Sequence, residues 1–338
     1  MAQRLSTENS KWKIPAHRVL LSPITHAPDS EYMAGEFWKE LKSCGNSSIL
    51  SQCIEVENCL ISQDRLVEWA RGIHRELKES TCNIECLTKL ASHYLTHLVI
   101  AFVNPGGHKM PQGTTHPTPD NQCIKNIQDL LNKAKIQRKH SALRELVLMR
   151  DGPKCLLTKY PFHGSGRVRV ECTHIIPFSV HDKTITVAAI EAFSRKVLPA
   201  MFIKDHINTP KNALNLQADA HTTMDHNLSW GIEARWVEDK WKYFYRTVQS
   251  HDVAGTIKLR DGDEIPFGQG NQMIDLPDPC ICNLHLAVAR VSHACGASEI
   301  FKEYVDGDGE EHMMPVYFGG PYMGDDVLMR MLEARLDI

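Results

Sequence analysis

The chain has 338 residues, of which 42% are hydrophobic and 23% charged, a composition typical of a folded globular protein and not of a disordered one. Its formal net charge is −3 at pH 7, so the chain as a whole lacks the strongly basic character of proteins that coat nucleic acid. The longest apolar run, residues 98–103, is too short to cross a bilayer, and the first 16 residues lack an apolar signal-peptide core. We therefore expect an intracellular, cytoplasmic protein without membrane contact.

The charges are distributed unevenly, which suggests three regions. Residues 1–140 carry 17 basic and 14 acidic residues, residues 141–250 carry 15 and 11, and residues 251–338 carry 6 and 16. We expect a helical N-terminal region with a proline- and glycine-rich linker over residues 1–120. A mixed α/β module is expected over residues 121–250, and an acidic helical extension over residues 251–338.

Helical spacing of apolar residues dominates the first region. It predicts helices within residues 31–103, and four prolines and three glycines over residues 104–120 predict a loop. A further helix is expected from residue 121 to Arg150, where Gly152 and Pro153 end it.

The central region predicts short strands and helices in alternation. Runs 155–158 and 168–171 predict a hairpin, residues 182–204 contain a helix, residues 214–216 a strand and residues 219–226 a short helix. Alternating aromatic residues over 230–236 and 241–245 predict a second hairpin with a buried aromatic face. Asp278 and Pro279 then predict the start of a helix that runs to about Cys295.

Four polar residues between positions 174 and 225 form a candidate reaction site. His221 and Asp225 are four residues apart and therefore share one face of the predicted short helix. An imidazole and a carboxylate in that arrangement can bind one metal ion. His174, at the end of a predicted strand, can act as a general base if it lies opposite them, and the Asn212 amide can hold the imidazole or its loop by hydrogen bonding.

The segment that carries these residues resembles the HNH (ββα-metal) nuclease superfamily, in the branch abundant in filamentous fungi. The resemblance rests on LVLMRDGPKC, ECTHIIPF, NALNL and HTTMD, and on the later PDPCICNLHLAVARVSHACGASE, and covers about residues 140–305. It implies an α+β fold with a helical N-terminal part, an HNH-type ββα module with an extra β-hairpin over residues 121–250, and C-terminal helices.

The resemblance also implies roles for individual residues. His174 matches the general base, Asn212 the central asparagine, and His221 and Asp225 the metal ligands. Thr173 stands where the family commonly has a further ligand, and a neutral hydroxyl is a poor ligand, so the metal site is expected to be weak or vestigial. Glu171 is a possible substitute, but strand alternation places it on the opposite face from His174.

Two catalytic functions therefore remain open, beside a third hypothesis of a degenerate HNH domain that serves only as a binding scaffold. The 38-residue span between His174 and Asn212 contains an apolar insertion, roughly residues 181–205, which either packs as core or roofs an apolar pocket. With such a pocket, the HNH scaffold would serve fungal natural-product biosynthesis as a cyclase of the Diels–Alderase type. It would act on an apolar small molecule without a cofactor, and His174, Asn212 and Thr173 would be its catalytic residues.

The alternative is an HNH endonuclease that hydrolyses DNA or RNA with a weakly bound divalent metal, for which a nuclear location also fits. In that case activity should fall as the pH drops through a His174 pKa near 6–7.

Overall fold

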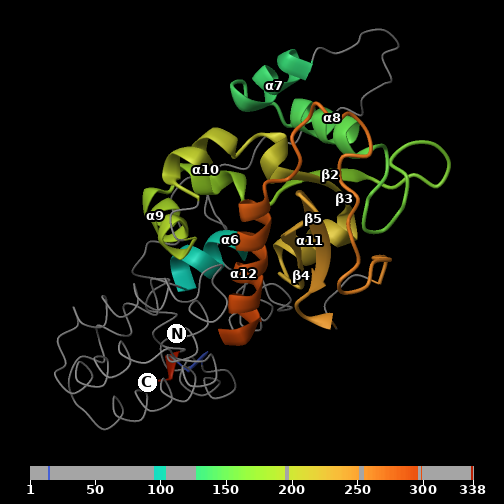
Figure 1. The fold of residues 1–338 in the computed structure, drawn as a ribbon. Helices are drawn as coiled ribbons and strands as arrows, with labels where there is room; N and C mark the ends of the chain where they lie inside the picture. Colours follow the sequence, from blue (N-terminus) through green and yellow to red (C-terminus); the bar gives the residue numbers. More distant parts are fainter. Residues whose placement is uncertain are drawn as a thin grey trace, which may run out of the picture.

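Helices and short strands alternate along the computed structural model (Figure 1), which describes residues 14–15, 95–103, 127–194, 198–250, 255–295, 298 and 336–337. The helices expected within residues 31–94 and the loop expected over residues 104–120 lie outside this set. Within it, helices combine with small antiparallel sheets, so the α+β class is confirmed. None of the helices in these ranges is long and apolar enough to cross a membrane.

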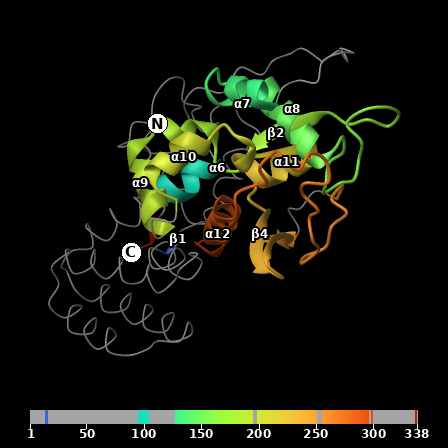
Figure 2. The same ribbon diagram turned by 45° about the horizontal axis from the view of Figure 1, so that its top comes forward.

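The helix predicted from residue 121 to Arg150 is two helices. They are α7 (Ile127–Lys135) and α8 (His140–Asp151), which lie against each other in both views (Figure 2). Arg138 breaks the run with a φ of 52°, a left-handed conformation that an α-helix cannot contain. Helix α8 ends at Asp151, and Gly152 follows with a φ of 86°, as the glycine and proline predicted.

A two-stranded antiparallel sheet carries the centre of the fold. Strand β2 (Val170–His174) pairs with β3 (Ala213–Gln217), with Thr173 opposite Leu214. The hairpin predicted between runs 155–158 and 168–171 is therefore wrong, because the partner of β2 lies about 40 residues further along the chain. The predicted strand at 214–216 and the predicted helix at 219–226 are confirmed by β3 and by α11 (Ala218–Asp225).

The β2–β3 sheet is covered by helices on both faces. On one face, Cys172 and Ala213 pack with α7 and α8. On the other, Leu214 and Leu216 belong to the main core, together with residues of α11. Since side chains alternate between the faces of a strand, neighbouring residues of β2 lie in two different environments.

The insertion between β2 and β3 is helical. It holds η2 (Phe178–Asp182), α9 (Thr184–Phe193), α10 (Ala200–His206) and η3 (Pro210–Asn212). Its larger apolar side chains are mostly buried in the main core, namely Val187, Ile190, Phe193, Leu198 and Ile203, whereas Ile185 and Met201 are exposed. The insertion thus packs as core, the first of the two alternatives.

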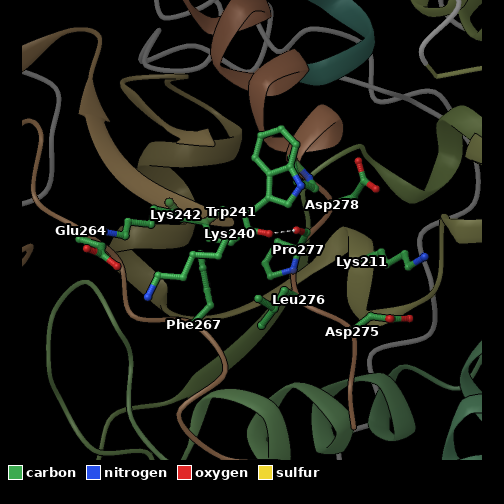
Figure 3. A pocket seen from close by; sticks show the side chains of 12 residues that line it. Lys211, Lys240, Trp241, Lys242, Glu264, Phe267, Asp275, Leu276, Pro277 and Asp278 are labelled. Atoms are coloured by element: carbon green, nitrogen blue, oxygen red, sulfur yellow. Dashed lines mark hydrogen bonds between the residues drawn. The ribbon is translucent and has the colours of Figure 1, made fainter. Parts of the chain in front are cut away.

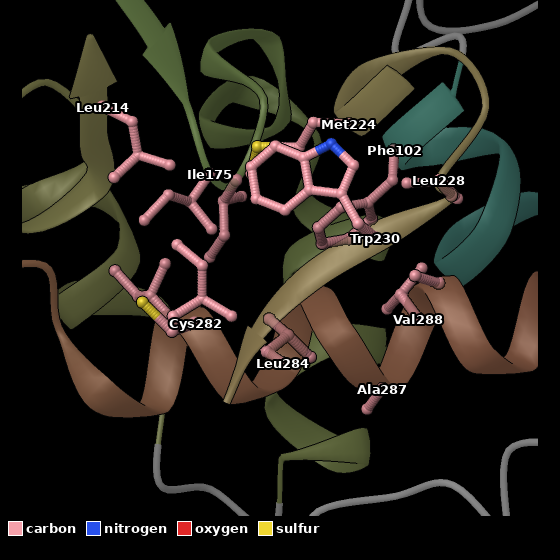
Figure 4. Close-up of a cluster of buried hydrophobic side chains, with 14 of the residues drawn as sticks. Phe102, Ile175, Leu214, Met224, Leu228, Trp230, Cys282, Leu284, Ala287 and Val288 are labelled. Atoms are coloured by element: carbon pink, nitrogen blue, oxygen red, sulfur yellow. The ribbon is translucent and has the colours of Figure 1, made fainter. Parts of the chain in front are cut away.

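The second hairpin and the last long helix complete the core. Strands β4 (Trp230–Val237) and β5 (Lys240–Thr247) pair in the register Ile232 to Tyr245, and α12 (Pro279–Cys295) packs against β4. Trp230 is fully buried at the centre of this cluster (Figure 4). Trp236 and Trp241 are 59% and 42% exposed, so the aromatic face predicted to be buried is buried only at the end of the hairpin away from the turn.

Two local features explain how α12 docks. The Asp278 carboxylate accepts hydrogen bonds from the backbone N–H groups of Cys280 and Ile281, at 2.9 and 3.2 Å, which confirms the predicted cap. A Cβ on Gly231 of β4 would lie 3.0–3.1 Å from the backbone and side chain of Leu286. Glycine at this position therefore allows the helix and the strand to approach closely.

The remaining described elements are short. They are η1 (Leu95–Ile100), a π-helical turn that continues into α6 (Ala101–Val103), and the two-residue strands β1 (Ile14–Pro15) and β6 (Leu336–Asp337), which pair in parallel. Leu98, Val99 and Phe102 contribute to the same core as α12. Residues from all three predicted regions therefore meet in one cluster.

Candidate functional site

Strand β2 and helix α11 bring three of the predicted site residues into contact. The Nε2 of His221 lies 2.7 Å from Oδ2 of Asp225, as their four-residue spacing on a helix predicted. The hydroxyl of Thr173, on β2, lies 3.4 Å from the same Asp225 oxygen. Thr173, which stands at a ligand position of the family, therefore lies beside the expected metal ligand Asp225.

Glu171 joins this cluster through a contact with the other ring nitrogen of His221. Its Oε2 lies 2.5 Å from Nδ1 of His221. Glu171 and Thr173 are two residues apart in a strand and therefore face the same side, which is the α11 side. Alternation correctly placed Glu171 on the other face from His174, but its contact with His221 depends on where α11 packs and could not be read from the spacing.

Two carboxylates control the charge of His221. Burial by itself would lower the pKa of His221, but the hydrogen bonds and charges of Asp225 and Glu171 outweigh burial and raise that pKa to about 9. At neutral pH the ring is therefore an imidazolium that donates one hydrogen bond to each carboxylate.

His174 occupies a different environment at the end of β2. Burial lowers its pKa to about 4, although a hydrogen bond to Asn208 opposes this. The imidazole is therefore neutral at neutral pH, as a general base must be. The pKa near 6–7 expected from the sequence is too high, because an isolated histidine does not experience this burial.

Asn212 holds the loop that follows β2 and not the imidazole. Its fully buried amide accepts a hydrogen bond from the backbone N–H of Ile176, at 2.7 Å, and donates to the carbonyls of Ile176 and Ile207, both at 2.9 Å. Of the two roles that the sequence left open for Asn212, the structure selects the second. The partner of the His174 ring is Asn208, which sequence reasoning missed.

Arg150 is a second residue that sequence reasoning missed. Its fully buried guanidinium forms a two-pronged pair with Asp151, at 2.6 and 2.9 Å, and donates to the carbonyls of Pro210 and Ala213. These two carbonyls lie immediately on either side of the Lys211–Asn212 segment. Arg150 thus ties the end of α8 to the start of β3, a task suited to the rigid donor fork of arginine.

The side chains around His221 form a limited donor set for a divalent ion, the cofactor that the resemblance to HNH nucleases implies. His221 and Asp225 offer one imidazole nitrogen and one carboxylate on the same side, with the Thr173 hydroxyl beside them. No group of three or more His, Cys, Asp or Glu side chains is placed to hold a metal ion within the ranges that the structure describes. Two such ligands fall short of a zinc site, but they fit a weakly held divalent ion that keeps several waters. The Asp225 carboxylate is the ligand type that magnesium and manganese prefer, whereas the imidazole suits zinc, nickel or iron.

Contacts of His221 are consistent with this fit. Histidines that bind metals commonly donate their other ring N–H to a carboxylate, and Glu171 occupies that position on Nδ1. Nε2 faces the Asp225 carboxylate, so an ion held there would replace the Nε2 proton. Binding should consequently be weak and should improve as the pH rises.

A cavity of about 460 Å³ lies away from these residues, beside the β4–β5 hairpin (Figure 3). Its lining combines three lysines and three acidic residues with a few apolar side chains, and it includes Trp241 and Leu276. None of its lining residues comes from the 181–205 insertion, and none is a predicted site residue. This cavity is therefore not the apolar pocket that the cyclase hypothesis requires.

Residues 155–229 match a family model described as HNH endonuclease, HNH_2. No curated protein and no solved structure matches the chain. The matched segment contains β2, β3 and α11, and with them every predicted site residue, so the candidate site lies in an HNH endonuclease-like segment of the chain.

Proposed function

We propose that this protein is an HNH-type endonuclease that hydrolyses phosphodiester bonds of DNA or RNA. The observation that carries the proposal is that the HNH-like segment holds the paired His221 and Asp225 on α11 and, at the end of the adjacent strand β2, a neutral His174 whose pKa both of them influence. These are the groups that metal-assisted hydrolysis of a phosphodiester requires: a base for the attacking water and ligands for one ion.

Each residue has a defined task in this reaction. His174 accepts a proton from the attacking water as the water oxygen bonds to phosphorus and the P–O bond to the leaving oxygen breaks, and the leaving oxygen then takes a proton from solvent. Asn212 keeps the chain after β2 in place, so that the imidazole stays at the end of the strand. His221 and Asp225 would hold a divalent ion, which would supply stabilisation of the charge that develops on the phosphate and on the leaving oxygen.

Basic residues near the site support a polyanionic substrate. Residues 141–250 carry 15 basic against 11 acidic side chains, whereas the rest of the chain has a net negative charge. Arg169 is largely exposed and lies 3.7 Å from Glu171, and the Arg138 guanidinium lies 5.6 Å from the ring centre of Phe178. Under this proposal both side chains would contact phosphates that flank the cleaved bond.

The cyclase hypothesis has no comparable support. It requires an apolar cavity roofed by the 181–205 insertion, but the larger apolar side chains of that insertion are mostly buried in the core. Catalysis of an apolar cyclisation, like the fungal origin, therefore remains a hypothesis from the sequence, and no second function is proposed.

Cleavage of supercoiled plasmid and of a labelled RNA, with magnesium or manganese added, tests the proposal. The His174→Gln variant should lose activity by roughly 10²–10⁴-fold, the usual contribution of a general base, and Asp225→Asn should require more metal. His163 is exposed, so His163→Gln serves as the matched control and should cleave like the wild type.

The pH dependence adds an independent criterion. Because the pKa of His174 is about 4, its base form predominates well into the acidic range. With the metal at a saturating concentration at each pH, which removes the pH dependence of metal binding, activity should not fall between pH 7 and pH 5. Failure of the wild type to cleave either nucleic acid with any divalent ion, or full activity of His174→Gln, would refute the proposal.

A further inference from the structure

Asn208 makes a close contact with His174, although it lies outside the five motifs on which the family resemblance rests. Its Oδ1 is 2.9 Å from Nε2 of the His174 ring, and only 3% of the residue is exposed. A buried side chain at hydrogen-bond distance from the candidate base can determine which ring nitrogen carries the proton.

The direction of this hydrogen bond follows from the other end of the amide. Nδ2 of Asn208 donates to the backbone carbonyl of Ala134, in α7. A carbonyl can only accept, so the NH₂ group must face Ala134 and the amide oxygen must face the ring. Because the amide oxygen can also only accept, Nε2 of His174 must carry the hydrogen.

A neutral imidazole has one ring hydrogen. With that hydrogen on Nε2, Nδ1 of His174 is left with a free lone pair. A nearby histidine does not compete for the bond: the His140 ring centre is 6.3 Å from that of His174, and its own Nε2 is bonded to the Cys172 carbonyl at 2.8 Å.

We propose that Asn208 is the positioning residue of the site, which holds His174 as the Nε2–H tautomer and so makes Nδ1 the atom that accepts the proton from water. The part that concerns proton transfer rests on the proposed nuclease function, whereas the tautomer does not. The arrangement resembles in principle the third member of a catalytic triad, which orients an imidazole without touching the substrate. Here the third member is in turn held by α7, which lies outside the segment that matches the family model.

Nitrogen-15 NMR of the full chain tests the tautomer directly. Protonated and bare ring nitrogens have well-separated shifts, and the His174 signals are assigned by their loss in His174→Gln. At mildly alkaline pH, Nε2 should be protonated and Nδ1 bare in the wild type. Asn208→Leu should give a mixture of tautomers, whereas Asn208→Asp, which keeps an acceptor facing Nε2, should retain the wild-type tautomer.

The matched control is Asn215→Leu. Asn215 is also a buried asparagine of this unit that donates to a backbone carbonyl, that of Arg144 at 3.0 Å, whereas the hydrogen bond of the His174 ring goes to Asn208. Circular dichroism and thermal melting check that each variant is folded. In the cleavage assay Asn208→Leu should lower kcat by about tenfold or more with little change in KM, because the base and not the substrate contact is affected.

The outcomes separate the two proposals. Protonation of Nδ1 in the wild type, or an unchanged tautomer in folded Asn208→Leu, would overturn the role of Asn208. The expected tautomers in a protein that cleaves neither DNA nor RNA would overturn the nuclease function while the role of Asn208 in orienting the ring would stand.

Discussion

Replacing Asn212 by alanine should destabilise the protein far more than the same replacement at Asn215. The Asn212 amide makes three hydrogen bonds to backbone groups of the loop between β2 and β3, at 2.7 to 2.9 Å, and is completely buried. Each net bond contributes about 1 kcal/mol, and each buried partner left unsatisfied costs about 1–3 kcal/mol, so we expect a loss of roughly 3–6 kcal/mol in the free energy of unfolding.

Asn215→Ala provides the matched comparison. The Asn215 amide makes one such bond, to the Arg144 carbonyl, and its Oδ1 is buried with no partner in the described part of the chain. Its removal should cost only about 1–2 kcal/mol. Urea unfolding followed by circular dichroism gives both values. If Asn212→Ala costs no more than Asn215→Ala, the three bonds do not hold the loop as described.

Three further predictions follow from single residues. Gly270→Ala should destabilise strongly, as thermal melting would show, because its Cβ would lie 2.2 Å from the Met149 carbonyl oxygen; a melting temperature like that of the wild type would show that the loop can move away. Thr173→Asp should raise magnesium or manganese affinity by adding a carboxylate beside Asp225, and calorimetry without a gain would show that the two positions do not converge. The folded-state pKa of His174, about 4, lies below its ordinary value of 6.5, so the unfolded chain binds a proton first. The free energy of unfolding should therefore fall by at most about 3 kcal/mol as the pH drops from 6.5 towards 4, and this loss should be smaller in His174→Gln. Denaturant titrations at several pH values measure it, and an equal loss in both proteins would contradict the prediction.

Local patterns in the sequence predicted much of the fold. Helix α11, strand β3, the β4–β5 hairpin and the capped start of α12 depend on periodicity, turn residues and caps that lie within a few residues of one another. The same local logic placed His221 and Asp225 on one helix face. It failed for β2, whose partner strand is separated from it by a helical insertion, because pairing over such a distance leaves no local signal.

The chemistry of the site depended on tertiary structure. Residue types and spacing alone indicated His174, Asn212, His221 and Asp225. Which of them carries a charge could not be read from the sequence, since burial lowers the pKa of one histidine while two carboxylates raise that of the other. Nor could the sequence predict the hydrogen-bond partners that other parts of the chain supply, such as Asn208. The sequence by itself therefore determined which chemical groups the site contains and the local secondary structure that carries them. The packing of β2 between α8 and α11 decided the protonation and the hydrogen-bond partners of these groups, because both properties depend on residues distant in the chain.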